Sequence, residues 1–242
     1  MQSKRFWEID ALRGIAVILM VFFHALFDLR FFAGVSLGFS TEFWFWFPRA
    51  TASIFILLAG VSLSISSSRA SHLPKKAMRK KFLWRGLKIF SYGLAITAFT
   101  FFFSPQEFIA FGILHFIGLS IILSIPFQRL KSENIALAFV SVALGFFLSG
   151  MHAGTGFLLW LGITPLGFTT FDFFPLFPWF GLILFGIALG NWLYPNAARA
   201  ISLPDHSKNP LIGAFSFIGR NSLKIYFLHQ PILIALIIFL LP

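Results

Sequence analysis

The chain contains no cysteine and little charge, and both absences limit what the protein can be. Without cysteine among its 242 residues, it cannot form disulfides, use a thiolate nucleophile or bind a metal through cysteine. Charged residues make up 11% of the sequence, against about 25% in soluble domains. Hydrophobic residues make up 58%, and the mean hydropathy is +0.86. This composition predicts a polytopic membrane protein.

Long hydrophilic stretches are also missing, so residues 1–242 are expected to form one transmembrane domain. Segments that approach the roughly 20 apolar residues of a membrane-spanning helix cover residues 11–32, 43–66, 82–103, 108–127, 135–151, 174–194 and 223–241. The glycine-rich piece 154–162 is too short to span and is expected to be interfacial or re-entrant, with a hidden eighth span there as the alternative. The fold class is therefore predicted to be all-α, a polytopic bundle of about seven spans.

Acidic residues are few, and the basic residues fall in alternate connections between the expected spans. The formal net charge is +11, with the densest basic cluster between residues 69 and 85. Because short loops rich in Lys and Arg stay in the cytoplasm, this pattern predicts a cytoplasmic amino terminus. The positive charge is interpreted first as a topology signal and second as attraction to anionic membrane lipid. Nucleic acid is not expected as a partner, because the aromatic residues lie in the apolar segments.

The first apolar segment carries an arginine, a histidine and a carboxylate. At about 100° per residue, His24 lies roughly 20° past three full turns from Arg13, and Asp28 lies about 40° beyond His24, so all three face one side. Ionisable groups are costly in hydrocarbon and usually point into a protein interior or a wet cavity. The segment therefore predicts an active site. The alternative is that Arg13 only extends to the interface and His24 makes one structural hydrogen bond.

Other expected spans carry further polar groups. The helical rise puts the histidines of three spans in the outer half of the membrane. Each one alone is more often a satisfied polar contact between helices, but together they predict a convergent polar site formed by His24, Asp28, Arg49, His115, Asp172 and His229. No metal site is expected, because the histidines lie on separate spans without a close pair. A Gly-x-Ser-x-Gly hydrolase motif is also missing.

Asp28 follows His24 by one helical turn. A carboxylate beside an imidazole can fix its tautomer and raise its basicity, as general-base catalysis requires. The alternatives are that the two side chains have no functional relation, or that Asp28 pairs with Arg30 or Arg49.

The order of these residues resembles a known family. Asp10-Ala-Leu-Arg-Gly14 followed by His24 resembles the Arg-x₁₀-His signature of the acyltransferase-3 transmembrane superfamily. The fuller pattern is similar to small prokaryotic proteins that resemble the catalytic domain of heparan-alpha-glucosaminide N-acetyltransferase. The supporting stretches are Phe55-Ile-Leu-Leu-Ala-Gly60, Gly112-Ile-Leu-His115, Asp172-Phe-Phe-Pro-Leu-Phe-Pro-Trp-Phe-Gly181 and Gly219-Arg-Asn-Ser-Leu-Lys-Ile-Tyr-Phe-Leu-His-Gln-Pro231.

The resemblance implies a membrane-bound acyltransferase in the plasma membrane of a prokaryote. It would move an acyl group, expected to be acetyl, from cytoplasmic acyl-CoA to a hydroxyl or amine of a sugar or glycan on the far side. His24 is then the catalytic residue, oriented by Asp28, and the CoA phosphates are expected at Arg13, Lys76, Arg79 and Lys80. Arg49, His115, Asp172, His229 and Gln230 are expected to bind the acceptor. The chain lacks the luminal domain of the lysosomal enzyme, so a heparan-like acceptor does not follow.

Two other functions fit the same residues. A proton-coupled transporter also uses intramembrane His, Asp and Arg, but it predicts an internal repeat, and the histidine-bearing spans share no pattern. A non-catalytic scaffold or sensor predicts that His24 can be replaced without consequence.

Overall fold

The computed structural model describes residues 5–240, and the regular structure in that range is helical apart from two isolated β-bridges. The α-helices are α1 (Trp7–Phe32), α2 (Thr41–Arg69), α3 (Lys75–Phe103), α4 (Ile113–Leu123), α5 (Ser132–Leu148), α6 (Leu176–Leu193), α7 (Pro210–Arg220) and α8 (Ser222–Leu240). Short 3₁₀ helices are η1 (Ile125–Phe127), η2 (Gly156–Leu161) and η3 (Pro195–Ala197). The all-α prediction is confirmed.

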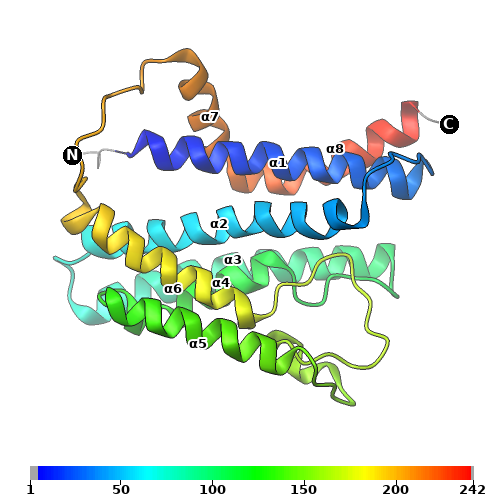
Figure 1. Ribbon diagram of the computed structural model, residues 1–242, viewed down its shortest axis with the longest axis horizontal. Coiled ribbons are helices and arrows are strands. Elements are labelled where there is room, and N and C mark those ends of the chain that lie inside the picture. Colours follow the sequence, from blue (N-terminus) through cyan, green and yellow to red (C-terminus); the bar gives the residue numbers. More distant parts are fainter. Residues whose placement is uncertain (1–4, 241–242) are drawn as a thin grey trace. The chain divides into compact units, whose positions relative to one another are not determined.

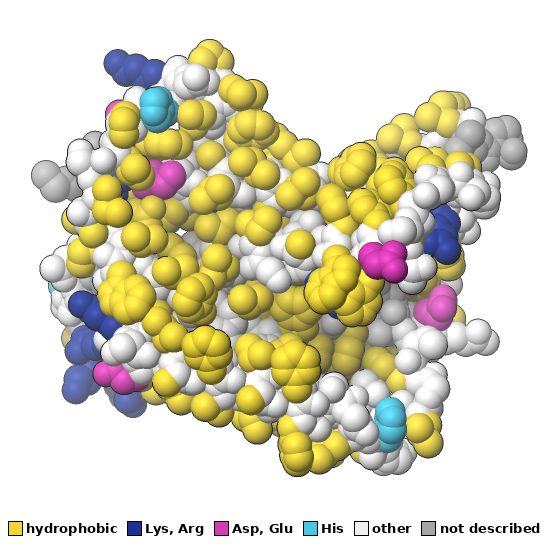
Figure 2. All heavy atoms as spheres, in the orientation of Figure 1, with side chains coloured by type: hydrophobic (Ala, Val, Ile, Leu, Met, Phe, Trp, Pro, Cys, Tyr) yellow, Lys and Arg dark blue, Asp and Glu magenta, His cyan; other side chains and the backbone are white. Residues whose placement is uncertain are grey.

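Five of these helices are long and apolar enough to cross a membrane, namely α1, α2, α3, α6 and α8. Each coincides with an expected span. Large side chains on the helices are left uncovered by the protein: Phe102, Phe146 and Phe239 are 86%, 77% and 84% exposed. Figure 2 shows hydrophobic side chains over most of the visible face. Such surfaces fit helices that contact lipid tails.

The expected span at 108–127 is wrong as a continuous helix. Only α4, with 11 residues, is α-helical there, and 11 residues rise about 16 Å against a hydrocarbon core of about 30 Å. The chain before α4 pairs instead with the segment before α6, where the N–H groups of Phe171 and Phe174 donate to the carbonyls of Glu107 and Phe111. Pro126 in η1 follows α4 and stops it from continuing. Helix α5, with 17 residues, is also shorter than the five long helices.

One other local expectation needs correction, the alternative of an eighth span is excluded within the described residues, and one helix was missed. The basic cluster assigned to a loop begins α3 at Lys75, directly after Pro74, because Lys and Arg are good helix formers. The piece 154–162 holds only the six-residue η2, so within residues 5–240 no eighth span lies there. Helix α7 was not expected from the sequence. Its signal was Asn209, whose side chain accepts from the N–H groups of Leu211 and Ile212, followed by Pro210 at the first helical position.

The chain folds into two compact units. The terminal unit comprises Met1–Leu58 and Leu203–Pro242, and the central unit comprises Ala59–Ser202. Helix α2 begins in the terminal unit and ends in the central unit. The expectation of one domain over 1–242 stays a prediction.

In the terminal unit, α7 and α8 both pack along α1 (Figure 1). Glycines allow α7 to approach. A Cβ built on Gly14 of α1 would collide with the carbonyl oxygen of Phe215, and one on Gly219 of α7 would collide with the carbonyl oxygen of Asp10. The two backbones are therefore in direct contact, which only residues without a side chain permit. Helix α8 continues after Asn221 and brings its polar residues to the second half of α1.

In the central unit, α3 packs against α4 and α5 packs against α6. Glycines again mark the crossings. A Cβ on Gly118 of α4 would lie 2.5 Å from the backbone nitrogen of Phe90 in α3, and one on Gly181 of α6 would lie 2.8 Å from the carbonyl oxygen of Ala138 in α5. Helices that pack this closely have room for polar side chains at only a few positions along their interface.

Candidate active site

Two of the expected site histidines lie side by side in the terminal unit. His24 on α1 and His229 on α8 have ring centroids 4.9 Å apart, with the ring planes inclined by 59°. His229 is 8% exposed. Residues 205 positions apart in sequence therefore meet because α8 packs along the second half of α1. The sequence predicted that both would line one site, but nothing in the local pattern indicated that their rings would touch.

The hydrogen bonds of His229 define its tautomer. Its Nδ1 lies 2.8 Å from the carbonyl oxygen of Tyr226 and 3.2 Å from that of Ile225. A carbonyl only accepts, so Nδ1 carries the proton and donates it. In a neutral imidazole the other nitrogen, Nε2, is then an acceptor with a free lone pair. Nε2 of His229 is therefore left as an unpartnered hydrogen-bond acceptor within the described residues.

Asp28 has a different partner from the one expected. The carboxylate is fully buried, and its Oδ1 accepts a hydrogen bond of 2.9 Å from Nε2 of Gln230 on α8. Within residues 5–240 it forms no ion pair with Arg30 or Arg49 and no hydrogen bond with His24. The neutral amide of Gln230 therefore binds the carboxylate of Asp28. This hydrogen bond joins α1 to α8 next to the histidine pair.

Four buried polar atoms of this group have no hydrogen-bond partner in the part of the chain that the structure describes. They are Nδ1 of His24, Oδ2 of Asp28, Nε2 of His229 and Oε1 of Gln230. Most buried polar atoms in proteins are paired, and a cluster of exceptions calls for a functional explanation. We name these four residues the α1/α8 polar cluster. Three of these free atoms, on Asp28, His229 and Gln230, act as hydrogen-bond acceptors. The fourth, Nδ1 of His24, can either donate or accept a hydrogen bond.

The two arginines expected at the site have other contacts. Arg13 forms a salt bridge of 3.3 Å with Asp10, one turn earlier on α1. Arg49 on α2 donates to the carbonyl of Phe45 at 2.8 Å, and its guanidinium lies 3.6 Å from the centre of the Phe45 ring. Arg49 is exposed, and its described contacts stay on its own helix. Neither arginine is placed in the α1/α8 polar cluster by a described contact.

His115 lies in the central unit, where both ring nitrogens are occupied. Its Nδ1 accepts from the N–H of Gly112 at 3.2 Å, so its Nε2 carries the proton and donates to the hydroxyl of Thr97 at 3.3 Å. Thr97 in turn donates to the carbonyl of Ile109 at 2.6 Å. The ring, which is 2% exposed, joins α3 to the start of α4. This is the satisfied polar contact that was the alternative interpretation for each histidine.

Asp172 belongs to the same part of the central unit. Its Oδ2 accepts from the N–H of Ile113 in the first turn of α4, at 3.1 Å. A carboxylate there satisfies a free N–H group and lies at the favourable end of the helix dipole. Burial raises the pKa of Asp172 to about 6, although the N–H groups of Ile113 and Phe173 act in the opposite direction. Asp172 and His115 therefore both hold the beginning of α4.

The residues expected to bind the CoA phosphates stand at the start of α3. Lys76, Arg79 and Lys80 lie in its first two turns and are exposed. Their placement on a helix fixes their spacing, since residues three or four apart share one face. Arg13 belongs to the terminal unit and these three residues to the central unit.

The sequence did not indicate a buried amide network in the central unit. The side-chain amide of Asn191 donates to the carbonyls of Gln128 and Leu130 at 3.0 and 2.7 Å, and its Oδ1 accepts from Ser64 at 2.6 Å. Asn134 donates to the carbonyl of Leu130 at 3.0 Å as well. These bonds hold the turn between α4 and α5. Amides near expected loops are common, so no pattern marked them in advance.

Together these observations define a helical protein of the membrane type that carries an ionisable cluster between apolar helices. The family is given by comparison with known proteins. The family model described as heparan-alpha-glucosaminide N-acetyltransferase, catalytic, matches residues 5–231. The chain belongs to this family, as the sequence resemblance predicted.

The match begins before α1 and ends inside α8, so it includes both helices of the polar cluster. Family membership implies a membrane-bound activity similar to N-acetyl transfer, with acetyl-CoA as donor. Neither a search of curated proteins nor a search of solved structures found a match.

Proposed function

We propose that the protein is a membrane acyltransferase that moves an acetyl group from cytoplasmic acetyl-CoA to a hydroxyl or amine on the far side of the membrane. The observation that carries the proposal is the α1/α8 polar cluster, in which a first-span histidine with a free buried nitrogen lies against a second histidine. The family match supports the acetyl donor. The acceptor class, a sugar or glycan, comes from the resemblance alone.

In the proposed reaction His24 is the general base. It takes the proton from the acceptor O–H or N–H as that oxygen or nitrogen bonds to the acetyl carbon. The thioester C–S bond breaks, and protonated His24 passes the same proton to the CoA sulfur, so that CoA leaves as the thiol and His24 is neutral again. Nε2 of His229 is placed to accept a hydrogen bond from His24 or from the acceptor, because its own proton is held at Nδ1. An acetyl group held transiently on His24 is the alternative route.

The other residues of the cluster are proposed to position the reacting groups. Gln230 holds Asp28, and the free Oδ2 of Asp28 is available to orient the acceptor or His24. Arg49 is proposed to contact the acceptor from α2. His115 and Asp172 form hydrogen bonds at the start of α4. These bonds support a role in positioning that helix, rather than in contacting the acceptor.

The donor phosphates are proposed to bind basic residues at the cytoplasmic side. The exposed start of α3 offers Lys76, Arg79 and Lys80, and Arg13 offers a planar guanidinium already held by Asp10. This assignment follows the predicted orientation, with a cytoplasmic amino terminus in a prokaryotic plasma membrane. Membrane lipid is the expected surroundings of the exposed helix faces.

The proposal is tested with purified protein in vesicles loaded with amine and hydroxyl sugars. The vesicles used are those in which the protein is oriented with Lys76, on its predicted cytoplasmic side, at the outer surface. Radiolabelled acetyl-CoA is added outside these vesicles, and labelled product is measured inside them. Acetyl product within the vesicle supports the proposal. Flux of unmodified sugar driven by a pH gradient, with no acetyl product, would contradict the proposal and support a proton-coupled transporter instead.

Replacement of Asp28 by Asn is expected to lower acetyl transfer by an intermediate amount, about tenfold to a hundredfold, if the carboxylate positions the reacting groups. Gln230→Glu places a second carboxyl beside Asp28, and Gln230→Leu removes its hydrogen bond. Both should shift the pH profile of transfer, which a purely structural hydrogen bond would not do while the protein stays folded. Normal rates and an unchanged pH profile in all three variants would remove Asp28 from the mechanism.

Neutralising Lys76, Arg79 and Lys80 to Gln together is expected to weaken CoA binding by about tenfold or more, because each charge-assisted hydrogen bond to phosphate contributes. Arg13→Lys should weaken binding too, since it keeps the charge but loses the planar fork. Binding is measured by displacement of a fluorescent CoA. The matched control is Lys131→Gln, an exposed cation before α5. If binding is unchanged while membrane orientation reverses, the basic cluster is a topology signal alone.

A further inference from the structure

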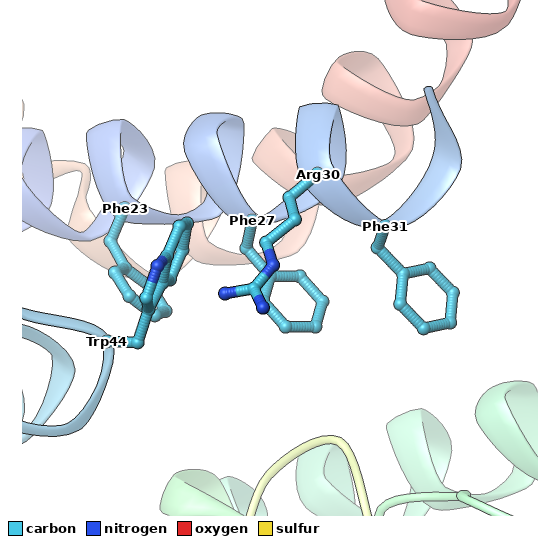
Figure 3. A pocket seen from close by; sticks show the side chains of 5 residues that line it. All are labelled: Phe23, Phe27, Arg30, Phe31 and Trp44. Atoms are coloured by element: carbon cyan, nitrogen blue, oxygen red, sulfur yellow. The ribbon is translucent and has the colours of Figure 1, made fainter. Parts of the chain in front are cut away.

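A groove of about 350 Å³ lies in the terminal unit between α1 and the start of α2. Four of its lining residues, Phe23, Phe27, Arg30 and Phe31, come from α1, and the fifth, Trp44, comes from α2. Figure 3 shows the three phenylalanine rings projecting from α1, with the Arg30 guanidinium between Trp44 and the Phe27 ring. The volume falls in the usual range of small-molecule sites, roughly 300–1,000 Å³.

The wall of the groove is aromatic along its whole length. The rings of Phe27 and Phe31 are stacked with centroids 5.7 Å apart and planes inclined by 11°, and those of Phe23 and Phe27 are stacked at 6.4 Å. One helical turn separates each ring from the next, so they form a ladder along α1. Phe31 is 51% exposed. The ladder gives an extended apolar chain a continuous aromatic contact surface.

Among the described residues that line the groove, Arg30 is the charged one. Its guanidinium lies 5.0 Å from the centre of the Trp44 ring. A guanidinium stacked on an aromatic ring keeps its N–H donors free at its edge, where they match a phosphate or carboxylate. Within the described residues Arg30 forms no ion pair with a carboxylate. The groove therefore combines an apolar wall with an available anion-binding group.

The groove adjoins the candidate catalytic residue. Phe23 precedes His24 in α1, and the two rings are in edge contact with centroids 5.8 Å apart. Phe23 also stacks on Phe47 at 6.0 Å, which fixes its position against α2. A molecule lying along the ladder would thus have one end close to His24 and an acidic group within reach of Arg30.

We infer that the groove binds an amphiphile in which a phosphate joins an apolar chain to a polar head, and that the acetyl acceptor is linked to lipid in this way. This inference rests on the proposed function, because it names the class of acceptor for the same site. The apolar chain would lie on the phenylalanine ladder, the phosphate would pair with Arg30, and the head with its hydroxyl or amine would face the α1/α8 polar cluster.

Binding is measured first, without any acetyl donor, so that it stands apart from catalysis. Native mass spectrometry of the full chain in a neutral detergent should detect one retained dodecyl phosphate. Octyl phosphate should bind several-fold more weakly, because it covers less of the ladder. Arg30→Gln and Phe27→Ala should each weaken dodecyl phosphate binding about tenfold, and Arg30→Lys should restore only part of it. The matched control Lys224→Gln, an exposed cation on α8, should leave binding unchanged.

Three results would overturn the inference. Equal retention of dodecyl glucoside would mean that the groove takes any apolar chain. Displacement of dodecyl phosphate by inorganic phosphate at similar concentrations would mean a free anion site. Equally tight binding of diacyl phosphatidylglycerol would mean ordinary membrane lipid.

Catalysis is then compared between two acceptors, free glucosamine and glucosamine joined through phosphate to a dodecyl chain. A KM that is lower for the linked acceptor, and that rises in Arg30→Gln, supports the inference. Equal KM values with normal acetyl transfer would refute the lipid-linked acceptor and leave the proposed function standing. No transfer to either acceptor, with dodecyl phosphate binding retained, counts against the proposed function instead.

Discussion

Replacement of His24 by alanine is expected to abolish acetyl transfer while the protein stays folded and binds CoA. The loss of a positioned general base typically lowers a rate by about 10² to 10⁴, and loss of a covalent acyl carrier could lower it further. The imidazole Nδ1 of His24 has no hydrogen-bond partner within residues 5–240, so its removal breaks no hydrogen bond of that atom. The measurement is the initial rate of transfer from radiolabelled acetyl-CoA by protein in vesicles.

The control for this prediction is His72→Ala. His72 is exposed, lies in the turn after α2 and belongs to the central unit, whereas His24 belongs to the terminal unit. Its removal should leave the rate unchanged. His24→Ala with a near-normal rate would refute the proposed mechanism and favour the transporter interpretation.

The missing cysteines help to separate the two catalytic routes. Label from acetyl-CoA that stays on the purified protein cannot be a thioester to cysteine, because the chain has none. Label present in the wild type, absent in His24→Ala and lost on addition of acceptor would establish an acetyl group carried by His24. Direct transfer, with His24 as base only, predicts no bound label at any time.

Gly219→Ala is expected to destabilise the protein by about 1–3 kcal/mol or more, because overpacking at a close contact forces the backbone to move. The new methyl group would collide with the carbonyl oxygen of Asp10 on α1. Gly14→Ala should behave alike, since its methyl would collide with the carbonyl oxygen of Phe215. Thermal unfolding in detergent measures the change. Activity should fall as well, because α8, which carries His229 and Gln230, follows directly after α7.

Gly213→Ala is the matched control on the same helix. A Cβ at Gly213 has no atom within 4 Å, and alanine is the better helix former by up to about 1 kcal/mol. This variant should therefore be neutral or slightly more stable. Equal stability of Gly213→Ala and Gly219→Ala would show that α7 does not pack on α1 as described.

The class of fold followed from local features of the sequence. Long apolar runs predict helices wherever they occur, and the five longest helices lie where the runs were found. The short length of α4 was not predicted, because an apolar run does not show where a helix begins or ends within it. The segment before α4 pairs with Phe171 and Phe174, and that pairing depends on residues about 60 positions away. Helix α7 was missed for the opposite reason, since its length is modest and its capping residues stand in a polar connection.

For the site, the sequence by itself determined that His24 and Asp28 share one face of an apolar helix, because helical periodicity is local. Only the tertiary structure decided their partners. It placed His229 against His24, gave Asp28 the amide of Gln230, and satisfied both nitrogens of His115 within the central unit. Such partners depend on which helices pack together, and the close backbone contacts at Gly14 and Gly219 pack α7, the helix that precedes α8, against α1. A single chain's residue pattern shows which side chains are costly in a membrane, whereas the packing of distant helices determines which of them meet.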